Sequence, residues 1–378
     1  MDNRSKFCFY KRKTMADWSN LPLDLLMLIA RRFNFLDDYV RFGVVCKSWR
    51  AVLFHKDSKN SPCSLLPLLM LTENESNDLR GFSSPFNKKV YQLYLPEVHG
   101  KRCWGSSHGW LITLDAKYQL RLLNPLSRVQ ILLPSLLKCL DLKNLVCRPE
   151  HFRDIYVHKV VLSSNPFLGN CVVLAIYSNN KMAFAKPGDE SWTPLQCCPS
   201  YAVNDAICFG GKFYVTDSSE DVTIYDSNGN HLKTVALTSS LVVYEPDEVA
   251  TYIAEVGGQI YVIVRIMYDL GDTSVLRTWN FKVYKLDKCN EKFEMVKTLG
   301  NWSIFIGNNH SFSIPSTEYP ECTSNCIYFT DDYYNPRVRC SYDMGIYSLD
   351  NHGIKPFLQK DLSYLKYSVP VWIKPLLW

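Results

Sequence analysis

The chain contains 378 residues, of which 47% are apolar and 13% aromatic, and its formal net charge is +5 with both signs interspersed. This composition predicts a globular protein with a packed core and lacks the clustered basic surface of a dedicated nucleic-acid binder, so we expect no nucleic-acid partner. No apolar run approaches the roughly 18 to 20 residues that span a bilayer, so we expect no membrane partner either.

The first 16 residues carry five basic side chains without a hydrophobic period, which predicts a flexible basic arm over residues 1–16. Lys11, Arg12 and Lys13 match a short nuclear-import signal, although a solvated tail is the favoured explanation. The 14 cysteines are scattered without a Cys-x-x-Cys pair, and the amino-terminal stretch lacks the apolar core of a secretory signal. We therefore expect reduced thiols and a location in the nucleus, the cytoplasm or both.

A helical segment is predicted over residues 18–54. Pro22 suits the first helical position, because its missing N–H has no intrahelical partner there in any case. Residues 25–30 are apolar without a break, so apolar side chains surround this helix instead of forming one stripe. Further helices are predicted over residues 38–45 and 46–53. Three helices in roughly 40 residues bury too little surface to stand alone, so the excess apolar face predicts a partner.

Two parts of this segment, residues 21–33 and 38–50, resemble an F-box in the order and spacing of their residues. The resemblance implies an F-box over residues 17–54 that docks on a Skp-type adaptor and, through it, meets the cullin and RING subunits of a ubiquitin ligase. It assigns docking or module-core roles, without separating the two, to Leu21, Pro22, Leu25, Ile29, Leu36, Val45, Cys46 and Trp49. The alternative is an ordinary helical subdomain that covers a sheet, and it leaves the excess apolar face unexplained.

After a polar linker over residues 55–62, the pattern changes to short apolar runs separated by turn residues, which predicts a mainly β domain over residues 63–378. The dipeptides Gly210-Gly211 and Gly257-Gly258 each separate two apolar runs, as in a hairpin, so neighbouring strands are expected to be antiparallel. The predicted strands cover residues 90–95, 110–114, 120–123, 171–177, 206–209, 212–216, 222–225, 252–256, 259–266, 280–286, 326–329 and 345–349.

A weak repeat of the form Gly-Gly-x-apolar-Tyr-Val starts at Gly210 and at Gly257, and looser versions start at Ser107 and Asn325. Repeats of about 40 to 50 residues with several antiparallel strands are typical of β-propeller blades. We therefore predict an antiparallel β-propeller-like domain without fixing the number of blades. A pair of β-sandwiches is the structural alternative.

The spacing of the repeat is irregular, and insertions are expected around residues 136–154 and 301–320. A propeller must also hide the edges of its first and last blades. We therefore predict that residues 90–95 and 370–373, from opposite ends of the domain, meet in or beside one closing blade and that Trp372 is buried there.

The β domain carries a second resemblance, to the C-terminal domain of plant kelch-like F-box proteins. The stretches that carry it are residues 101–111, 123–126, 307–313, 326–332 and 343–347. The resemblance implies a kelch-like fold and names no general substrate.

Residues 105–109 fit the Gly-x-Ser-x-Gly pattern of a hydrolase nucleophile elbow, but an apolar strand follows where the elbow needs a helix, so a tight turn is favoured. Cys322 and Cys326, with His310 and Cys340, have loose spacing for zinc, and Cys326 falls inside an apolar strand. No phosphate-binding or dinucleotide-binding fingerprint occurs. We therefore predict no catalytic residue, no metal site and no cofactor.

Aromatic residues expected in loops of the β domain are candidates for target recognition, because Tyr and Trp often anchor interfaces. They are Trp104, Tyr333 and Tyr334. The predicted function is a non-catalytic substrate-recognition subunit of an SCF-type cullin-RING ubiquitin ligase that presents an unknown target protein. The alternatives are a β-propeller small-ligand sensor or enzyme with an accessory helical module, and a scaffold that binds the adaptor without assembling an active ligase.

Overall fold

The chain divides into two compact units, Met1–Leu65 and Leu66–Trp378, and each packs around its own buried residues. The computed structural model describes residues 18–33, 35–53, 65–72, 78–139, 156–178, 180–237, 246, 248–269, 276–287, 289–331, 343–356 and 369–375.

The first unit consists of short helices packed around aromatic side chains. A 3₁₀ turn, η1 (Trp18–Asn20), precedes α1 (Leu23–Ala30), α2 (Leu36–Gly43) and α3 (Lys47–Leu53). The Phe42 ring lies 5.2 Å from the Phe33 ring and 4.6 Å from the Trp49 ring, centroid to centroid. The Trp49 indole N–H donates a hydrogen bond of 2.9 Å to the Trp18 carbonyl. The predicted three-helix module is therefore present, and Trp49 ties its first turn to its last helix.

The helix boundaries differ from the predicted ones by one or two residues. Pro22 has a ψ of 141° and is the N-cap of α1, not its first helical residue, and its carbonyl accepts hydrogen bonds from the Leu25 and Leu26 amides. α2 begins at Leu36 and ends at Gly43, so it is shifted toward the amino terminus relative to the prediction. Val45 consequently lies in the turn before α3.

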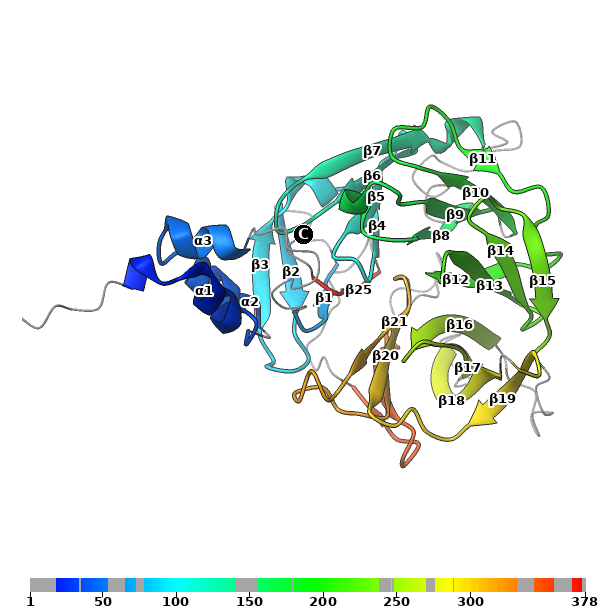
Figure 1. Cartoon of the computed structure of the whole chain (residues 1–378). Helices are drawn as coiled ribbons and strands as arrows, with labels where there is room; N and C mark the ends of the chain where they lie inside the picture. The colour runs from blue at the N-terminus through cyan, green and yellow to red at the C-terminus, as the bar shows by residue number, and fades with distance from the viewer. Residues whose placement is uncertain are drawn as a thin grey trace, which may run out of the picture. The chain divides into compact units, whose positions relative to one another are not determined.

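The second unit is a ring of β-sheets (Figure 1), of which the described residues form six. The sheets follow one another around the ring in chain order. This arrangement confirms the β-propeller prediction and excludes the sandwich pair, because small sheets in a ring replace large sheets packed face to face. The structure also supplies the number of blades, which the sequence left open.

The blades are numbered here from the closing blade onward. The first blade contains β25 (Val371–Ile373), β1 (Leu68–Met70), β2 (Leu79–Ser83) and β3 (Val90–Tyr94), and the second contains β4 (Arg102–Gly105), β5 (Leu111–Leu114), β6 (Gln119–Leu123) and β7 (Gln130–Ser135). The third contains β8 (Val157–Leu162), β9 (Val173–Tyr177), β10 (Lys181–Ala185) and β11 (Thr193–Pro194), and the fourth contains β12 (Val203–Phe209), β13 (Lys212–Asp217), β14 (Val222–Asp226) and β15 (His231–Val235). The fifth contains β16 (Glu248–Val256), β17 (Gln259–Asp269), β18 (Leu276–Asp287) and β19 (Lys292–Val296), and the sixth contains β20 (Trp302–Ile306), β21 (Phe312–Pro315), β22 (Cys326–Phe329), β23 (Gly345–Ser348) and β24 (Ile354–Lys355).

Glycine pairs form two of the tight hairpins. Gly210 and Gly211 join β12 to β13 with φ angles of 58° and 72°, and Gly257 and Gly258 join β16 to β17 with φ angles of 58° and 79°. Two successive positive φ angles are those of a type I′ turn, which glycine adopts without steric cost. Both predicted hairpins are therefore confirmed.

The last strand of the chain closes the ring. β25 pairs antiparallel with β1, with Trp372 opposite Leu69, and β3 belongs to the same sheet. Trp372 is fully buried, and its ring lies 5.1 Å from the ring of Phe305 in β20. The prediction that both ends of the domain meet in one closing blade is confirmed.

Two predictions about the last blade are wrong. β20 and β22 pair in parallel, with Ser303 opposite Cys326, whereas every other strand pair among the described residues is antiparallel. The predicted insertion over residues 301–320 contains both β20 and β21. Four of the five residues of β20 are buried, so the strand shows no alternation of polar and apolar residues by which the sequence would reveal it. The other predicted insertion begins with the 3₁₀ turn η3 (Leu136–Lys138), and most of it lies outside the described residues.

Buried apolar side chains fill the spaces between neighbouring blades. One cluster joins Trp110 of the second blade to Val160 of the third, and another joins Leu174 of the third to Ala206 of the fourth. These neighbouring blades therefore pack against each other through buried apolar side chains.

Candidate functional site

The first candidate site is the outer side of α1. Its buried side consists of Leu26, Met27 and Ala30. The opposite side is apolar as well, and its side chains at i, i+3 and i+4 are between 37% and 54% exposed: Leu25, Leu28 and Ile29. These three residues are called the apolar face of α1. A row of large apolar side chains on a surface helix marks a binding surface more often than a solvated one.

Further apolar side chains of the helical unit are exposed outside this face. Val44 and Val45, in the turn between α2 and α3, are 66% and 53% exposed, and Trp18 in η1 is also exposed. Leu28 and Val44 were not predicted as site residues. Leu28 lies three residues after Leu25 on the same side of the helix, and that spacing was the signal available in the sequence.

The structure divides the eight predicted docking residues into two groups. Pro22, Leu25, Ile29 and Val45 are exposed. Leu21, Cys46 and Trp49 are half-buried, and Trp49 contributes to the packing of the unit through Phe42 and Trp18. Leu36 begins α2, and its side chain lies outside the described residues. The exposed group is available to a partner, and the half-buried group also supports the module.

The second candidate site is a pocket of about 240 Å³ to which five blades contribute. Residues of β12 and Phe312 form the apolar part of the pocket wall. The polar side chains come from the β4–β5 turn, the end of β16, the segment from the β20–β21 loop into β21, and the residues after β25. They are Ser107, His108, Glu255, His310, Ser311, Ser313 and Lys374. The pocket therefore brings together residues that lie far apart in the sequence.

Two glycines allow the segments around this pocket to approach one another closely. A β-carbon at Gly105 would overlap the Trp372 carbonyl oxygen of the closing strand. Gly307 has a φ of 138°, and a β-carbon there would overlap the Thr330 hydroxyl. Only glycine fits at either position, the first for lack of space and the second for both space and conformation.

Backbone hydrogen bonds hold the β4–β5 turn to two distant segments. The His310 amide donates to the Gly105 carbonyl at 2.9 Å, and the Lys374 amide donates to the Ser106 carbonyl at 3.3 Å. Within the turn, the Ser106 hydroxyl oxygen accepts hydrogen bonds from the His108 and Trp110 amides. These local bonds agree with the predicted tight turn.

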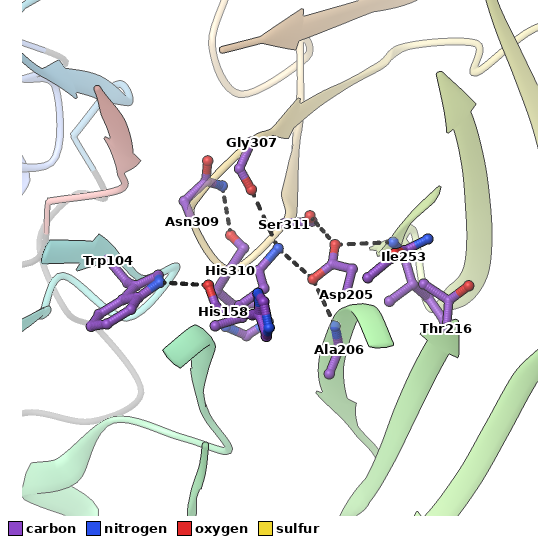
Figure 2. A network of polar contacts seen from close by, with 12 residues as sticks. Trp104, His158, Asp205, Ala206, Thr216, Ile253, Gly307, Asn309, His310 and Ser311 are labelled. Carbon is purple, nitrogen blue, oxygen red and sulfur yellow. Dashed lines mark hydrogen bonds and ion pairs between the residues drawn. The ribbon is translucent and has the colours of Figure 1, made fainter. Parts of the chain in front are cut away.

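A buried ion pair supports the loop that carries His310 (Figure 2). The Lys159 ammonium lies 2.5 Å from the Asp205 carboxylate and donates a hydrogen bond of 3.3 Å to the Gly307 carbonyl. The other carboxylate oxygen of Asp205 accepts hydrogen bonds from the Ser311 hydroxyl at 2.6 Å and the Ile253 amide at 3.1 Å. Burial raises the pKa of the Asp205 carboxyl above its ordinary value, although Lys159 and these hydrogen bonds act in the opposite direction. The convergence of donors on both oxygens fits the ionised form, because a carboxylate accepts at both.

His108 and His310 face each other with ring centroids 5.9 Å apart. Burial, with the charge of Lys374, lowers the pKa of His108 to about 4. Burial, with His108 and Lys159, lowers the pKa of His310 well below its ordinary value. Both imidazoles are therefore neutral at neutral pH, and each can accept a hydrogen bond through one ring nitrogen.

Ser107 lies closer to a base than the sequence indicated. Its hydroxyl oxygen is 3.5 Å from the Nδ1 atom of His310, although the two residues are 203 positions apart. That distance exceeds the roughly 2.6 to 3.2 Å of an activated nucleophile. In the described part of the chain no carboxylate orients the His310 ring, so the pair lacks the third group of a catalytic triad.

The prediction that Trp104 is a recognition residue in a loop is wrong. Trp104 lies in β4 and is fully buried, and its indole N–H donates a hydrogen bond of 3.0 Å to the His158 carbonyl (Figure 2). The short strand β4 had not been predicted, and its tryptophan belongs to the packing between the second and third blades. The other two candidates, Tyr333 and Tyr334, lie outside the described residues.

The residues considered for zinc do not form a ligand set within the described part of the chain. Cys322 and Cys326 are buried, and burial raises the pKa of Cys326 to about 11, which favours the thiol over the thiolate that binds metal. Cys340 lies outside the described residues. Within the described ranges there is no group of three or more His, Cys, Asp or Glu side chains arranged to hold a metal ion. The helices in those ranges are also too short to cross a bilayer.

A helical module with an exposed apolar face, followed by a six-bladed propeller, is the architecture of an F-box protein. The F-box domain family matches residues 18–60, and the family described as "KIB1-4 beta-propeller" matches residues 81–348. The chain therefore belongs to the KIB1-4 beta-propeller family and carries an amino-terminal F-box domain.

Several F-box proteins of Arabidopsis thaliana are similar to this chain along most of its length. "F-box protein SKIP23" is 25% identical over 95% of this chain and 96% of its own length, and "F-box/kelch-repeat protein At1g57790" is 28% identical over 95% and 94%. "F-box protein At2g26160" is 26% identical over 85% of this chain and 98% of its own length. The predicted resemblance to plant F-box proteins is confirmed, and the architecture supports a general role in substrate recognition for SCF-type ubiquitin ligases.

Proposed function

We propose that the chain is the substrate-recognition subunit of an SCF-type cullin-RING ubiquitin ligase in the nucleus or cytoplasm. Residues 18–53 dock on a Skp-type adaptor, the adaptor connects them to the cullin and RING subunits, and the propeller holds a target protein. The chain acts by proximity, placing target lysines near a ubiquitin-charged enzyme, and supplies no acid, base or nucleophile.

The observation that carries this proposal is the apolar face of α1. Leu25, Leu28 and Ile29 are about half exposed, and burying the exposed part of each against a partner is worth roughly 1 kcal/mol. The buried side of the same helix already fills the interior of the unit, so the packing of that unit does not need the outer side. A partner that covers it removes apolar surface from water without rearranging the module.

A second candidate function is favoured by the polar pocket of the propeller. A pocket with two neutral imidazoles and a hydroxyl near one of them fits a small-ligand sensor or an enzyme with an accessory helical module. This alternative assigns no role to the apolar face of α1. Adaptor binding by that face therefore separates the two functions.

The proposal is tested by reconstituting the ligase from the full chain, a Skp-type adaptor, a cullin and a RING subunit, and measuring ubiquitin transfer to lysines of the chain itself. The parent chain is compared with the double variant Leu25→Asp/Leu28→Asp, which places charges on the apolar face. The control is Leu132→Asp, a change of the same kind at an exposed leucine of β7.

Transfer is expected for the parent and the control and is expected to be lost in the double variant, because a charge facing an apolar surface is desolvated without a partner. Equal transfer in all three proteins would contradict docking through α1. Adaptor binding without any transfer would support the scaffold alternative instead.

A further inference from the structure

The last strand of each blade forms one edge of its sheet, and most of these edges are protected against pairing with another chain. β7 and β11 contain Pro134 and Pro194, and the register of β15 is broken. β19 carries Lys292 and Glu294, and β24 has two residues, one of which is Lys355. Prolines, charges, breaks in register and short strands are common means by which proteins protect sheet edges.

The edge strand of the first blade, β3, has none of these features. Its five residues are uncharged, include no proline and pair with β2 in one unbroken register. Its alternate side chains Val90, Gln92 and Tyr94 are exposed, and Tyr94 is 60% exposed. Leu79 of β2, which lies opposite Tyr94, is 43% exposed and adds apolar surface. An uncharged edge strand with β-branched and aromatic side chains is a template for a further strand.

The backbone of β3 presents hydrogen-bonding groups on the side that faces away from β2, which is called the outer edge of β3. The Ser84 amide donates to the Lys89 carbonyl at 2.9 Å, and the Leu95 amide donates to the Asp78 carbonyl at 2.7 Å. Bonding alternates along an antiparallel strand, so the residues that direct their amides and carbonyls to the outer edge are Val90, Gln92 and Tyr94. Among the described residues, no strand pairs with this edge.

The two ends of the outer edge differ. The Arg128 guanidinium donates to the Tyr94 carbonyl and also to the Glu97 carboxylate at 2.6 Å, so this end is neutral and one carbonyl is engaged. Lys88, which lies in the turn before β3, is exposed and adds positive charge at the other end. A second copy paired about a two-fold axis would meet Arg128 at both ends of the pairing, whereas a single peptide meets it once. The edge therefore favours a peptide over a second copy.

We propose that the outer edge of β3 binds an extended segment of the target protein as an added antiparallel strand. Main-chain hydrogen bonds to Val90 and Gln92 hold the segment, and its alternate apolar side chains pack beside Val90 and Tyr94. An acidic residue at its carboxyl end lies near Lys88, because an antiparallel partner ends where β3 begins. The inference deepens the proposed function and rests on it in calling the bound protein a target, but the binding itself requires no adaptor.

The test uses the full chain and saturation-transfer NMR, which detects weak binding of small probes. The probe is the peptide acetyl-Ser-Val-Thr-Val-Thr-Val-Asp-amide. Its matches are the same peptide with proline for the central valine and the same peptide with lysine for aspartate. The variants are Gln92→Pro, which removes an amide from the outer edge, and Lys88→Glu. The control is Lys292→Glu, at an exposed lysine of the edge strand β19.

Saturable binding of the probe is expected for the parent and for Lys292→Glu, and the proline peptide should bind about fivefold more weakly or worse, because a carbonyl of β3 loses its donor. Gln92→Pro should weaken binding of the probe by a similar factor. It should also keep the fold, since proline is accepted in an edge strand where its nitrogen faces away from the sheet. Lys88→Glu should weaken binding about threefold and make the lysine peptide the better ligand, as for an exposed ion pair. If Gln92→Pro fails to fold, this reversal decides the test.

Equal binding of the probe by the parent and a folded Gln92→Pro protein, equal binding of the probe and the proline peptide, or the absence of saturable binding would overturn the proposal. A parent dimer in sedimentation that Gln92→Pro abolishes would assign the edge to a second copy and would overturn it as well. None of these outcomes affects docking through α1, which is measured with the adaptor, so failure of this inference is distinguishable from failure of the proposed function.

Discussion

Gly105 determines how closely β4 approaches the closing strand β25. Its carbonyl accepts the His310 amide, and its α-carbon lies where a side chain would overlap the Trp372 carbonyl. The sequence placed this glycine in a tight turn, where glycine is often needed for a positive φ angle. The reason is space, because φ at Gly105 is not positive, in contrast to Gly109 at 76°.

The variant Gly105→Ala is therefore expected to lower the free energy of unfolding by about 1 to 3 kcal/mol, as overpacked sites do, because backbone must move to admit the methyl group. The matched change Gly169→Ala introduces a methyl group into open space at a φ of 79°, so only backbone strain of about 1 kcal/mol is expected. Chemical denaturation of both variants measures the difference. A loss at Gly105 no larger than that at Gly169 would show that the closing strand adjusts freely.

The sequence did not show which single residues of α1 are exposed. Leu25 and Leu26 are the same residue type, and the unbroken apolar run places leucines on both sides of the helix. The pattern thus predicted an excess face without saying which residues form it. The F-box resemblance assigned docking roles to Leu25 and Ile29. It did not assign one to Leu28, which is more exposed than either.

Among the strands, β25 is short but connects distant parts of the propeller. Its three residues pair with β1, and Trp372 packs against Phe305 in the last blade. The strand thereby joins the first blade to the last and places Lys374 at the pocket. Loss of this strand leaves β1 with an unpaired edge, which is a site for aggregation.

Trp372→Ala is expected to cost about 3 to 5 kcal/mol, because a fully buried tryptophan at the closure of the ring leaves a cavity. The control is Trp279→Ala, since Trp279 in β18 is 71% exposed and its removal should change stability by no more than about 0.5 kcal/mol. Thermal unfolding of the two variants provides the comparison. Similar midpoints would mean that closure through β25 does not hold the ring.

The sequence predicted the elements whose ends are marked by residues next to them in the chain. The glycine pairs that follow β12 and β16, together with the apolar runs beside them, are such marks. Among the strands that it missed are β11 and β24, which have two residues each, and β20, which shows no alternation. The others that it missed are β1, β2, β4, β7, β8, β10, β15, β19 and β21. It also missed the parallel pairing of β20 with β22, because the order of strands in a sheet depends on contacts remote in the chain.

In the molecule as a whole, the two candidate sites differ in how far the sequence reveals them. The helical module is continuous over residues 18–53, so spacing along one short segment indicated both its fold and its excess surface. The pocket takes its polar residues from Ser107 to Lys374, across five blades. No local pattern predicts that Ser107 and His310 are neighbours, and only the closed ring brings them together.

In the proposed function, the apolar face of α1 binds a Skp-type adaptor. Isothermal titration calorimetry of the full chain with purified adaptor, at several temperatures, tests it directly. We predict single-site binding with a negative heat-capacity change, since apolar surface is buried, and loss of that binding in Leu25→Asp/Leu28→Asp but not in Leu132→Asp. Parent-like affinity in the double variant, or a heat-capacity change near zero, would contradict the claim.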